Sequence, residues 1–367
     1  MSKTTDVAII GGGVIGCSIA YQLAKRGVEC TVFDKDRFAS GASGATAGIV
    51  GPIWYVDHSI KPYFELGMRS LKMFPTLTAE LKEAGVDPEF QQNGVVQVAL
   101  TDELNDLLHE NLVWQGELGI GVHWIDRHEL LEREPEITPV AQGGVLSPKE
   151  GSIVGKAFVD ALVHAASRLG TSCLEGVEVT GLEMDGDKVI GVRTLTETYH
   201  SNHTILAAGP WTGLAKRWLP QSIPVRPVKG QRILLRKPGF LPRCSVQSIV
   251  PQLDGCVISA ATREENIFDQ VVTAVGVAHM VSKARDVFPV LKDAEFISAT
   301  AGVRPGTPDG MPILGPVPGW GGLSIASGHD RVGIILSPVT GELIADYVVT
   351  GDDSKLEPFS ITRFGFE

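Results

Sequence analysis

The first 34 residues constrain the fold of this chain more than any other segment. An apolar run, Val7 to Ile10, leads into a G-x-G-x-x-G pattern, which is followed by apolar residues at helical spacing up to Leu23. A second apolar run, Cys30 to Phe33, then ends at Asp34. The three glycines of the pattern are Gly11, Gly13 and Gly16. This order predicts the βαβ unit of a Rossmann-like fold, in which a strand, a glycine turn, a helix, a second strand and an acidic residue follow one another.

Each residue of this unit has an expected role in holding a dinucleotide. Gly11 allows the tight turn, Gly13 lets the backbone approach a pyrophosphate, and Gly16 lets the helix lie close to the strand. The helix begins near Val14 and Ile15, where free N–H groups and the positive end of the helix dipole favour phosphate. Asp34 is placed to accept hydrogen bonds from ribose hydroxyls. The alternative is a glycine-rich turn with only a structural role.

Composition narrows the class of protein. With 367 residues, 43% hydrophobic and 20% charged, the chain can form a full core and is expected to form two domains. A net charge of -11 without a basic cluster argues against nucleic acid or an anionic membrane as partner. The N-terminus lacks a long apolar segment, so we expect no signal peptide and no membrane span. Five scattered cysteines without a C-x-x-C pair predict no metal site and fit a reducing cytoplasm.

Two further segments indicate which dinucleotide binds. Residues 37–48 (RFASGASGATAG) consist mostly of small residues, and residues 204–211 (TILAAGPW) form an apolar run that ends in small residues and glycine. Together with the N-terminal unit they resemble the FAD fold of the glutathione reductase superfamily, in the branch of D-amino acid oxidase, glycine oxidase and sarcosine oxidase. The resemblance implies FAD as the cofactor. It implies FAD contacts at Lys35, Ala42, Ser43, Ala47, Gly48, Ile49, Val179 and Gly209.

The rest of the chain suggests two interleaved domains. Residues 179–193 alternate around an Asp-Gly turn and predict a hairpin, and residues 156–169 predict an amphipathic helix. Strand-like runs at 233–236, 246–250 and 256–260 and a helix at 274–288 predict a mostly antiparallel sheet with helices on one face. We therefore predict an α/β fold with an α+β second domain. A Rossmann-like FAD-binding domain (1–80, 151–220 and 301–367) is interleaved with a substrate-binding domain (81–150 and 221–300).

The C-terminal part carries the most specific resemblance. The segments AGVRPGTPDGMPILG and SGHDRVGIILSPVTGE, within residues 301–342, resemble the C-terminal signature of glycine oxidase and its relatives. With the N-terminal segments, the resemblance therefore covers the whole chain. In that family the arginine of the first segment, here Arg304, holds the substrate carboxylate over the flavin. A guanidinium is a planar fork of donors that suits a carboxylate. The alternative is an arginine that is paired with an internal acid.

Residues 333–347 predict a helix whose N-terminus points at the pyrimidine edge of the flavin. Donors there stabilise the negative charge that reduction places on the ring. Arg331 corresponds to a second arginine beside the substrate in glycine oxidase, or else is a surface arginine at the helix start. His329 is expected to be structural, since nothing nearby completes a metal site. The expected contacts with FAD are His329, Asp330, Arg331, Val332, Gly333, Ile334 and Ile335.

One position departs from the family pattern. Ser248 stands where glycine oxidases have a tyrosine that helps to hold the carboxylate, so the pocket is expected to be wider there and more dependent on Arg304. Arg263 lies at a position that faces the active site in relatives, although a charged residue in such a run more often faces water. Trp54 and Tyr55 follow the flavin-contacting segment and either line the pocket or belong to the core.

These observations predict an FAD-dependent oxidase for glycine, sarcosine or a small D-amino acid. The products would be the keto acid, ammonia or an amine, and hydrogen peroxide, with molecular oxygen as acceptor and no side chain needed as acid or base. Residues 257–367 lack a cysteine, whereas sarcosine oxidases attach FAD through one near the carboxylate arginine, so noncovalent FAD is expected. Two alternatives stay open. One is a D-amino acid or proline dehydrogenase that passes electrons to a quinone or partner protein; the other is a non-catalytic flavin-binding subunit. A homo-oligomer is compatible with the sequence.

Overall fold

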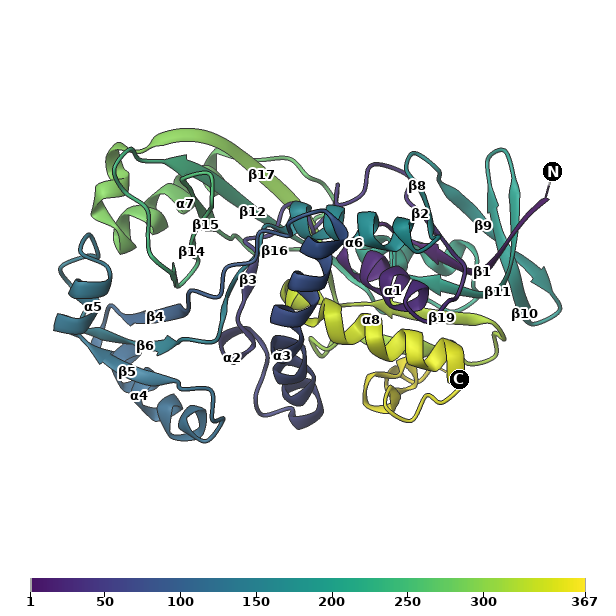
Figure 1. The fold of residues 1–367 in the computed structure, drawn as a ribbon, viewed down its shortest axis with the longest axis horizontal. Helices are drawn as coiled ribbons and strands as arrows, with labels where there is room; N and C mark the ends of the chain where they lie inside the picture. Colours follow the sequence, from purple (N-terminus) through teal and green to yellow (C-terminus); the bar gives the residue numbers. More distant parts are fainter. Residues whose placement is uncertain (1, 367) are drawn as a thin grey trace.

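The computed structural model describes residues 2–366, which form two large sheets joined by helices (Figure 1). The first sheet has eight strands and the second has nine. In the view of Figure 1 the first sheet occupies the right half and the second the left, with a long helix, α3 (Lys61–Ala84), between them. The mixed fold agrees with the predicted α/β class.

The first sheet is parallel at its centre. Its strand order is β18-β19-β11-β1-β2-β8, and neighbouring strands are parallel from β19 to β8. Within it, β1 (Ser2–Ile10) and β2 (Cys30–Phe33) flank the predicted glycine turn. A hairpin of β9 and β10 pairs antiparallel to β11, as the alternating pattern predicts. The other strands are β8 (Ser172–Leu174), β9 (Val179–Asp185), β10 (Lys188–Thr194), β11 (Thr198–Leu206), β18 (Ile313–Pro316) and β19 (Leu323–Ser327).

Both faces of this sheet are covered, which explains the continuous apolar run of β1. Val7 and Ile9 belong to the core beneath the helices α1 (Val14–Ala24), α3, α6 (Gly155–Arg168) and α8 (Gly333–Thr350). Ala8 and Ile10 face a second cluster formed with the β9–β10 hairpin. Strands buried on both faces lack polar alternation.

Helix α8 is mostly apolar. Within residues 2–366, the stretch Asp330–Thr350 is the one helix long and apolar enough to cross a membrane, and 67% of its apolar 18-residue window is buried inside the structure. It packs against α1 and α3. A helix this apolar is typical of a protein core, and its acidic residues Glu342 and Asp346 form ion pairs with Arg69 and Arg26 at the surface.

The second sheet is mostly antiparallel, as predicted. Its order is β16-β12-β15-β14-β13-β4-β6-β5, with β17 on the other side of β12, and only the short β13–β4 pair is parallel. Its strands are β4 (Val95–Ala99), β5 (His123–Asp126), β6 (Gly143–Ser147), β12 (Arg226–Arg236), β13 (Ser245–Val246), β14 (Ile249–Pro251), β15 (Cys256–Ala260), β16 (Glu264–Glu265) and β17 (Glu295–Gly306).

Two expectations about this sheet were wrong. Residues 246–250 are not one strand, because Gln247 has a φ of 52° and turns the chain between β13 and β14. Helices also cover both faces rather than one. Helices α5 (Arg127–Arg133) and α7 (Ala274–Val287) share a core cluster with Val96 and Val98, while α4 (Asp102–Gly116) packs with Ala99 and Val145, which point the other way.

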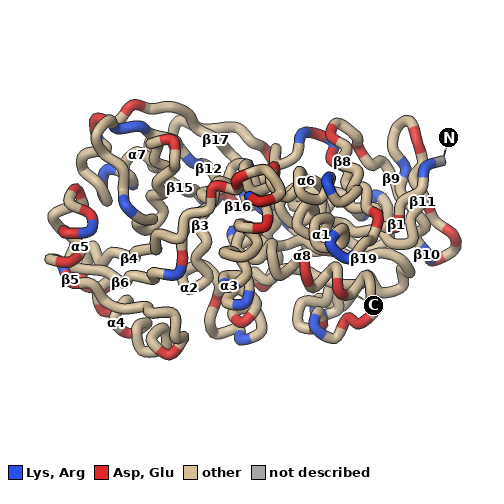
Figure 2. Tube along the Cα trace, viewed as in Figure 1, with Lys and Arg blue, Asp and Glu red and all other residues tan. Residues whose placement is uncertain are grey.

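Short elements complete the chain. The pair β3 (Ile49–Val50) and β7 (Gly151–Ser152) is antiparallel and leads into α2 (Pro52–Tyr55). Five 3-10 turns lie at 209–217, 289–293, 330–332, 357–359 and 361–364. Figure 2 shows acidic and basic residues interspersed over both halves of the molecule. We propose that the two sheets mark the predicted cofactor-binding and substrate-binding domains, with α3 on the cofactor side because it packs against α8.

Candidate active site

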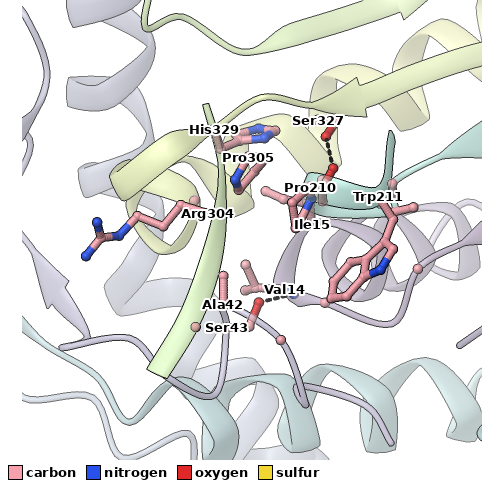
Figure 3. A pocket seen from close by; sticks show the side chains of 18 of the residues that line it. Val14, Ile15, Ala42, Ser43, Pro210, Trp211, Arg304, Pro305, Ser327 and His329 are labelled. Atoms are coloured by element: carbon pink, nitrogen blue, oxygen red, sulfur yellow. Dashed lines mark hydrogen bonds between the residues drawn. The ribbon is translucent and has the colours of Figure 1, made fainter. Parts of the chain in front are cut away.

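A cavity of about 720 Å³ lies where the two sheets meet. The first sheet contributes the carboxyl ends of its strands and the start of α1, and the second contributes residues of β12, β17 and the β13–β14 turn. The cavity brings together every site residue expected from the sequence except Gly16 and Val332. Figure 3 shows Arg304 and Trp211 pointing to opposite sides of the cavity, with Val14 and Ala42 between them in this view.

The glycine turn has the strained geometry that its sequence indicates. Gly11 has a φ of 116°, and a Cβ there would lie 2.4 Å from the carbonyl oxygen of Ala207 on the neighbouring segment. A Cβ on Gly16 would lie 2.0 Å from the Gly11 oxygen, so Gly16 lets α1 approach the turn and lies behind the cavity wall. The N–H of Val14 donates to Ser43 Oγ at 3.0 Å, which ties the helix start to the small-residue segment (Figure 3).

Asp34 lies in the cavity wall at the end of β2. Its Oδ2 accepts from the N–H of Gly12 at 2.8 Å, and its Oδ1 accepts from that of Asp36 at 2.9 Å. Burial raises the pKa of Asp34, and these two hydrogen bonds oppose the rise. Each carboxylate oxygen accepts more than one hydrogen bond, so Asp34 keeps capacity for ribose hydroxyls.

The small-residue segment is held against the second sheet by an arginine that the sequence did not mark. Arg232 on β12 donates to the carbonyl oxygens of Thr46 at 2.7 Å and Gly44 at 3.0 Å. Gly48, with a φ of 78°, is so close to Ile153 that a Cβ would lie 1.9 Å from its carbonyl oxygen. The positions of these small residues are therefore fixed by backbone contacts along the cavity wall.

His329 carries an unpaired nitrogen in the cavity wall. Its Nε2 lies 3.1 Å from Thr340 Oγ1, and its buried Nδ1 has no hydrogen-bond partner within residues 2–366. Burial lowers the pKa of His329 to about 3, so the ring is neutral at neutral pH. Helix α8 begins at Gly333 without a side-chain cap, which leaves backbone N–H groups for a ligand. The glycine turn, Asp34 and this unpaired nitrogen fit a bound FAD.

Arg304 on β17 has no acidic partner within the described residues. Its two terminal nitrogens donate only to the carbonyl oxygen of Thr262, both at 3.3 Å. The guanidinium lies over Gly230, where a Cβ would be 2.1 Å from it. Burial lowers the pKa of Arg304, but a guanidinium stays charged in proteins. The alternative of an arginine paired with an internal acid is therefore wrong.

Two other arginines line the cavity. Arg331 is exposed and its guanidinium lies 5.6 Å from the ring centroid of Tyr55. Arg263 forms ion pairs with Asp330 at 2.9 Å and with Glu265 at 2.7 Å. Asp330 has a φ of 40°, a backbone strain of the kind found at functional sites. These two ion pairs compensate the charge of Arg263. Its expected role as a substrate ligand stays a prediction.

Tyr55 and Lys283 line the cavity beside Ser248. The Tyr55 hydroxyl lies 3.5 Å from the carbonyl oxygen of Gln247. Burial raises the pKa of Tyr55 to about 12, so the hydroxyl stays protonated. Of the two possibilities stated for Trp54 and Tyr55, the Tyr55 ring lines the cavity on the side where a wider pocket was expected, whereas Trp54 packs against the core and does not line it. No pattern marked Lys283, since one lysine on a helix is indistinguishable from a surface residue.

A buried acid lies behind Tyr55. The Oε1 of Glu150 accepts from the N–H of Ile53 in α2 at 2.9 Å, and its Oε2 has no partner within residues 2–366. Burial raises the pKa of Glu150 from 4.5 to about 8. In the folded protein the Glu150 carboxyl group keeps its proton up to about pH 8, whereas in the unfolded chain it loses the proton above about pH 4.5. Glu150 is therefore protonated at neutral pH while it holds the start of α2.

This acid predicts a pH dependence of stability. Glu150 contributes most to the free energy of unfolding below about pH 4.5. This contribution decreases as the pH rises toward about 8, by up to about 5 kcal/mol. Glu150→Gln stays uncharged and should flatten the pH dependence of Tm over that range, measured with excess FAD. Glu117→Gln, at an exposed position on the surface, is the control and should leave the slope unchanged. Parallel curves for Glu150→Gln and the wild type would contradict the assignment.

Comparisons with known proteins agree with this geometry. The family model described as "DAO: FAD dependent oxidoreductase" matches residues 6–347. The chain is 35% identical to a glycine oxidase of Geobacillus kaustophilus over 99% of this chain and 98% of that protein. It is 32% identical to the HcnC subunit of hydrogen cyanide synthase from Pseudomonas aeruginosa, over 99% and 97%. The crystal structure of the Geobacillus kaustophilus glycine oxidase superposes with a TM-score of 0.92 at 34% identity, covering 98% of this chain and 99% of that one.

A family match over most of the chain and relatives above 30% identity along their full length show that this chain belongs to the DAO family of FAD-dependent oxidoreductases.

Proposed function

We propose that this protein oxidises glycine, sarcosine or a small D-amino acid at the bond between the α-carbon and nitrogen. The observation that carries the proposal is the guanidinium of Arg304, which faces the cavity without an acidic partner among the described residues. A planar fork of donors of this kind binds a carboxylate through two hydrogen bonds. Relatives that match this chain over almost the full length of both proteins include proteins named glycine oxidase.

When bound, FAD supplies the acceptor for the hydride of the α-carbon. Arg304 fixes the carboxylate, which turns an encounter into a positioned reaction. The positive charges of Arg304 and Arg331 disfavour a protonated substrate amine, so they favour the neutral amine that gives up a hydride. Tyr55, with its raised pKa, offers a hydroxyl donor beside Ser248. The one acid beside Arg304 in the wall, Asp330, is paired with Arg263, which agrees with a reaction that needs no side-chain base.

The contacts expected for FAD are part of the proposal. We assign the pyrophosphate to Gly11, Gly13 and the start of α1, and the ribose to Asp34. The residues of 42–49 would lie along the flavin, and those of 329–335 at its pyrimidine edge. Val179 and Gly209 would lie on the adenine side. FAD would be noncovalent, since the cavity wall contains no cysteine.

The test is to mix the purified protein anaerobically with glycine, sarcosine, D-alanine and D-proline and to follow the flavin absorbance. We expect at least one of them to bleach it. If none does, the assignment to small amino acids fails, and a protein that takes up no FAD contradicts the whole proposal. Readmitting air then separates an oxidase from a dehydrogenase, because an oxidase returns one hydrogen peroxide per substrate. We propose the oxidase, acting in the cytoplasm.

A further inference from the structure

The substrate end of the cavity holds more positive charge than one carboxylate neutralises. Four cationic side chains line it, and the acid among them is Asp330, which pairs with Arg263. The other acids of the cavity wall come from the ends of β2 and the segment before β9, on the expected ribose side: Asp34, Asp36 and Glu178. Within residues 2–366, the other three cations have no carboxylate within 4.0 Å: Lys283, Arg304 and Arg331.

Lys283 is the most constrained of these three. Its ammonium group, half-buried on α7, donates to Ser248 Oγ at 2.9 Å and to the carbonyl oxygen of Ala260 at 2.7 Å. An ammonium group has three donors, so one is left for a ligand. Ser248 accepts from Lys283, which leaves the hydrogen of its own hydroxyl free to donate. A half-buried charge with neutral partners alone is costly, and an anion at this place would compensate it.

Lys283 and Arg304 donate hydrogen bonds to backbone carbonyl oxygens of the same short segment. Arg304 donates to the carbonyl oxygen of Thr262, and Lys283 donates to that of Ala260, two residues earlier. Two residues of an extended chain span at most about 7 Å. With hydrogen bonds of 2.7 and 3.3 Å to these oxygens, the two cations lie within roughly 13 Å of each other along the same wall, within the span that the two carboxylates of a short acidic molecule and their hydrogen bonds cover.

We propose that Lys283 and Ser248 form a second carboxylate subsite, so that the preferred substrate is a small amino acid with a second carboxylate. The proposal rests on the proposed function, because Arg304 takes the α-carboxylate. Ser248 fits this role better than the tyrosine expected from relatives, because a small side chain leaves space beside the ammonium group. Arg331 is exposed at the cavity rim and stacks near Tyr55, so it is less suited to a desolvated carboxylate.

The test compares acidic substrates with uncharged partners of similar shape. The pairs are D-aspartate with D-asparagine, in which the second group is at the end of the side chain, and N-(carboxymethyl)glycine with N-ethylglycine, in which it is at the end of the substituent on nitrogen. We expect the acidic member of at least one pair to have a kcat/KM at least 10-fold higher. Lys283→Met should lower the ratio of kcat/KM for the acidic member to kcat/KM for its partner by about 10- to 100-fold. Lys283→Arg should restore part of this ratio.

Binding and control variants make the result specific. Succinate should perturb the flavin spectrum at lower concentration than butyrate, and Lys283→Met should remove the difference. Lys292→Met, an exposed lysine that does not line the cavity, should change neither ratio nor spectrum. Flavin content and Tm check that the variants fold.

Three outcomes would overturn the inference. The first is that the protein shows no preference for acidic substrates although glycine or sarcosine bleaches the flavin. This outcome would overturn the inference but not the proposed function. The second is an equal loss for both members of a pair in Lys283→Met. The third is a preference that disappears in Arg331→Met but persists in Lys283→Met. Failure of every substrate, acidic or not, would instead count against the proposed function.

Discussion

Replacing Arg304 by alanine is expected to lower kcat/KM for the amino acid substrate by roughly 30- to 5000-fold. The change removes the partner of a desolvated carboxylate, which costs about 2 to 5 kcal/mol. It should appear mainly in KM, because the carboxylate is bound in the ground state and in the transition state alike. Steady-state kinetics with the best substrate of the panel measure it. Flavin content should stay at the wild-type level, since the guanidinium donates hydrogen bonds only to the carbonyl oxygen of Thr262.

Two further variants show whether the loss comes from the carboxylate contact. Arg304→Lys keeps the charge but not the planar fork, so it should recover only part of the activity. Arg285→Ala removes an arginine on α7 whose ion-pair partner is the adjacent, exposed Asp286, and should change kcat/KM by less than about threefold. A KM for Arg304→Ala equal to that of the wild type would remove Arg304 from the substrate site.

Gly11→Ala should abolish FAD binding and destabilise the fold by more than about 3 kcal/mol. The alanine would have to adopt a φ of 116°, and its Cβ would meet the backbone of Ala207 and Ala208 at 2.4 to 2.9 Å. Backbone cannot move aside as a side chain can, so β1 and β11 would separate at the point where the pyrophosphate is expected. Chemical denaturation and the absorbance ratio of flavin to protein measure the two effects.

Gly27→Ala isolates the steric part of this prediction. Gly27 also has a positive φ, 75°, but a Cβ there meets nothing within 4 Å. The variant should therefore lose about 1 to 2 kcal/mol from the backbone conformation and keep its FAD. If Gly11→Ala behaves like Gly27→Ala, the contact with Ala207 does not control the cofactor site.

The sequence predicted the cofactor half of the molecule well. The family, the fold class and FAD as cofactor are confirmed by the comparisons. The reason is that the glycine turn is local: Gly11, Gly16 and Asp34 lie within 24 residues, and their spacing alone specifies strand, turn, helix and strand. The backbone at Gly11 and Gly16 has the close approaches that the motif requires.

The substrate half was less predictable, because its residues meet only through the tertiary structure. Tyr55 comes from a four-residue helix, Ser248 from a turn and Lys283 from a helix of the second sheet. No spacing in the sequence connects them. The run 246–250 was expected as one strand because three of its five residues, Val246, Ile249 and Val250, are apolar and β-branched. The φ of 52° at Gln247, which places Ser248 at the cavity, has no marker in a residue that is neither glycine nor asparagine.

The order of strands in the first sheet also determines when the protein can fold during synthesis. β1 is the first strand of this sheet in sequence order, yet its neighbour β11 pairs with β19, which ends at Ser327, and α8 follows only after that. The sheet cannot be completed until Ser327 has been made, so its early strands have unpaired edges until then. Pairings this distant in sequence form slowly and expose the chain to aggregation. We therefore expect added chaperones to raise the yield of folded protein in cells.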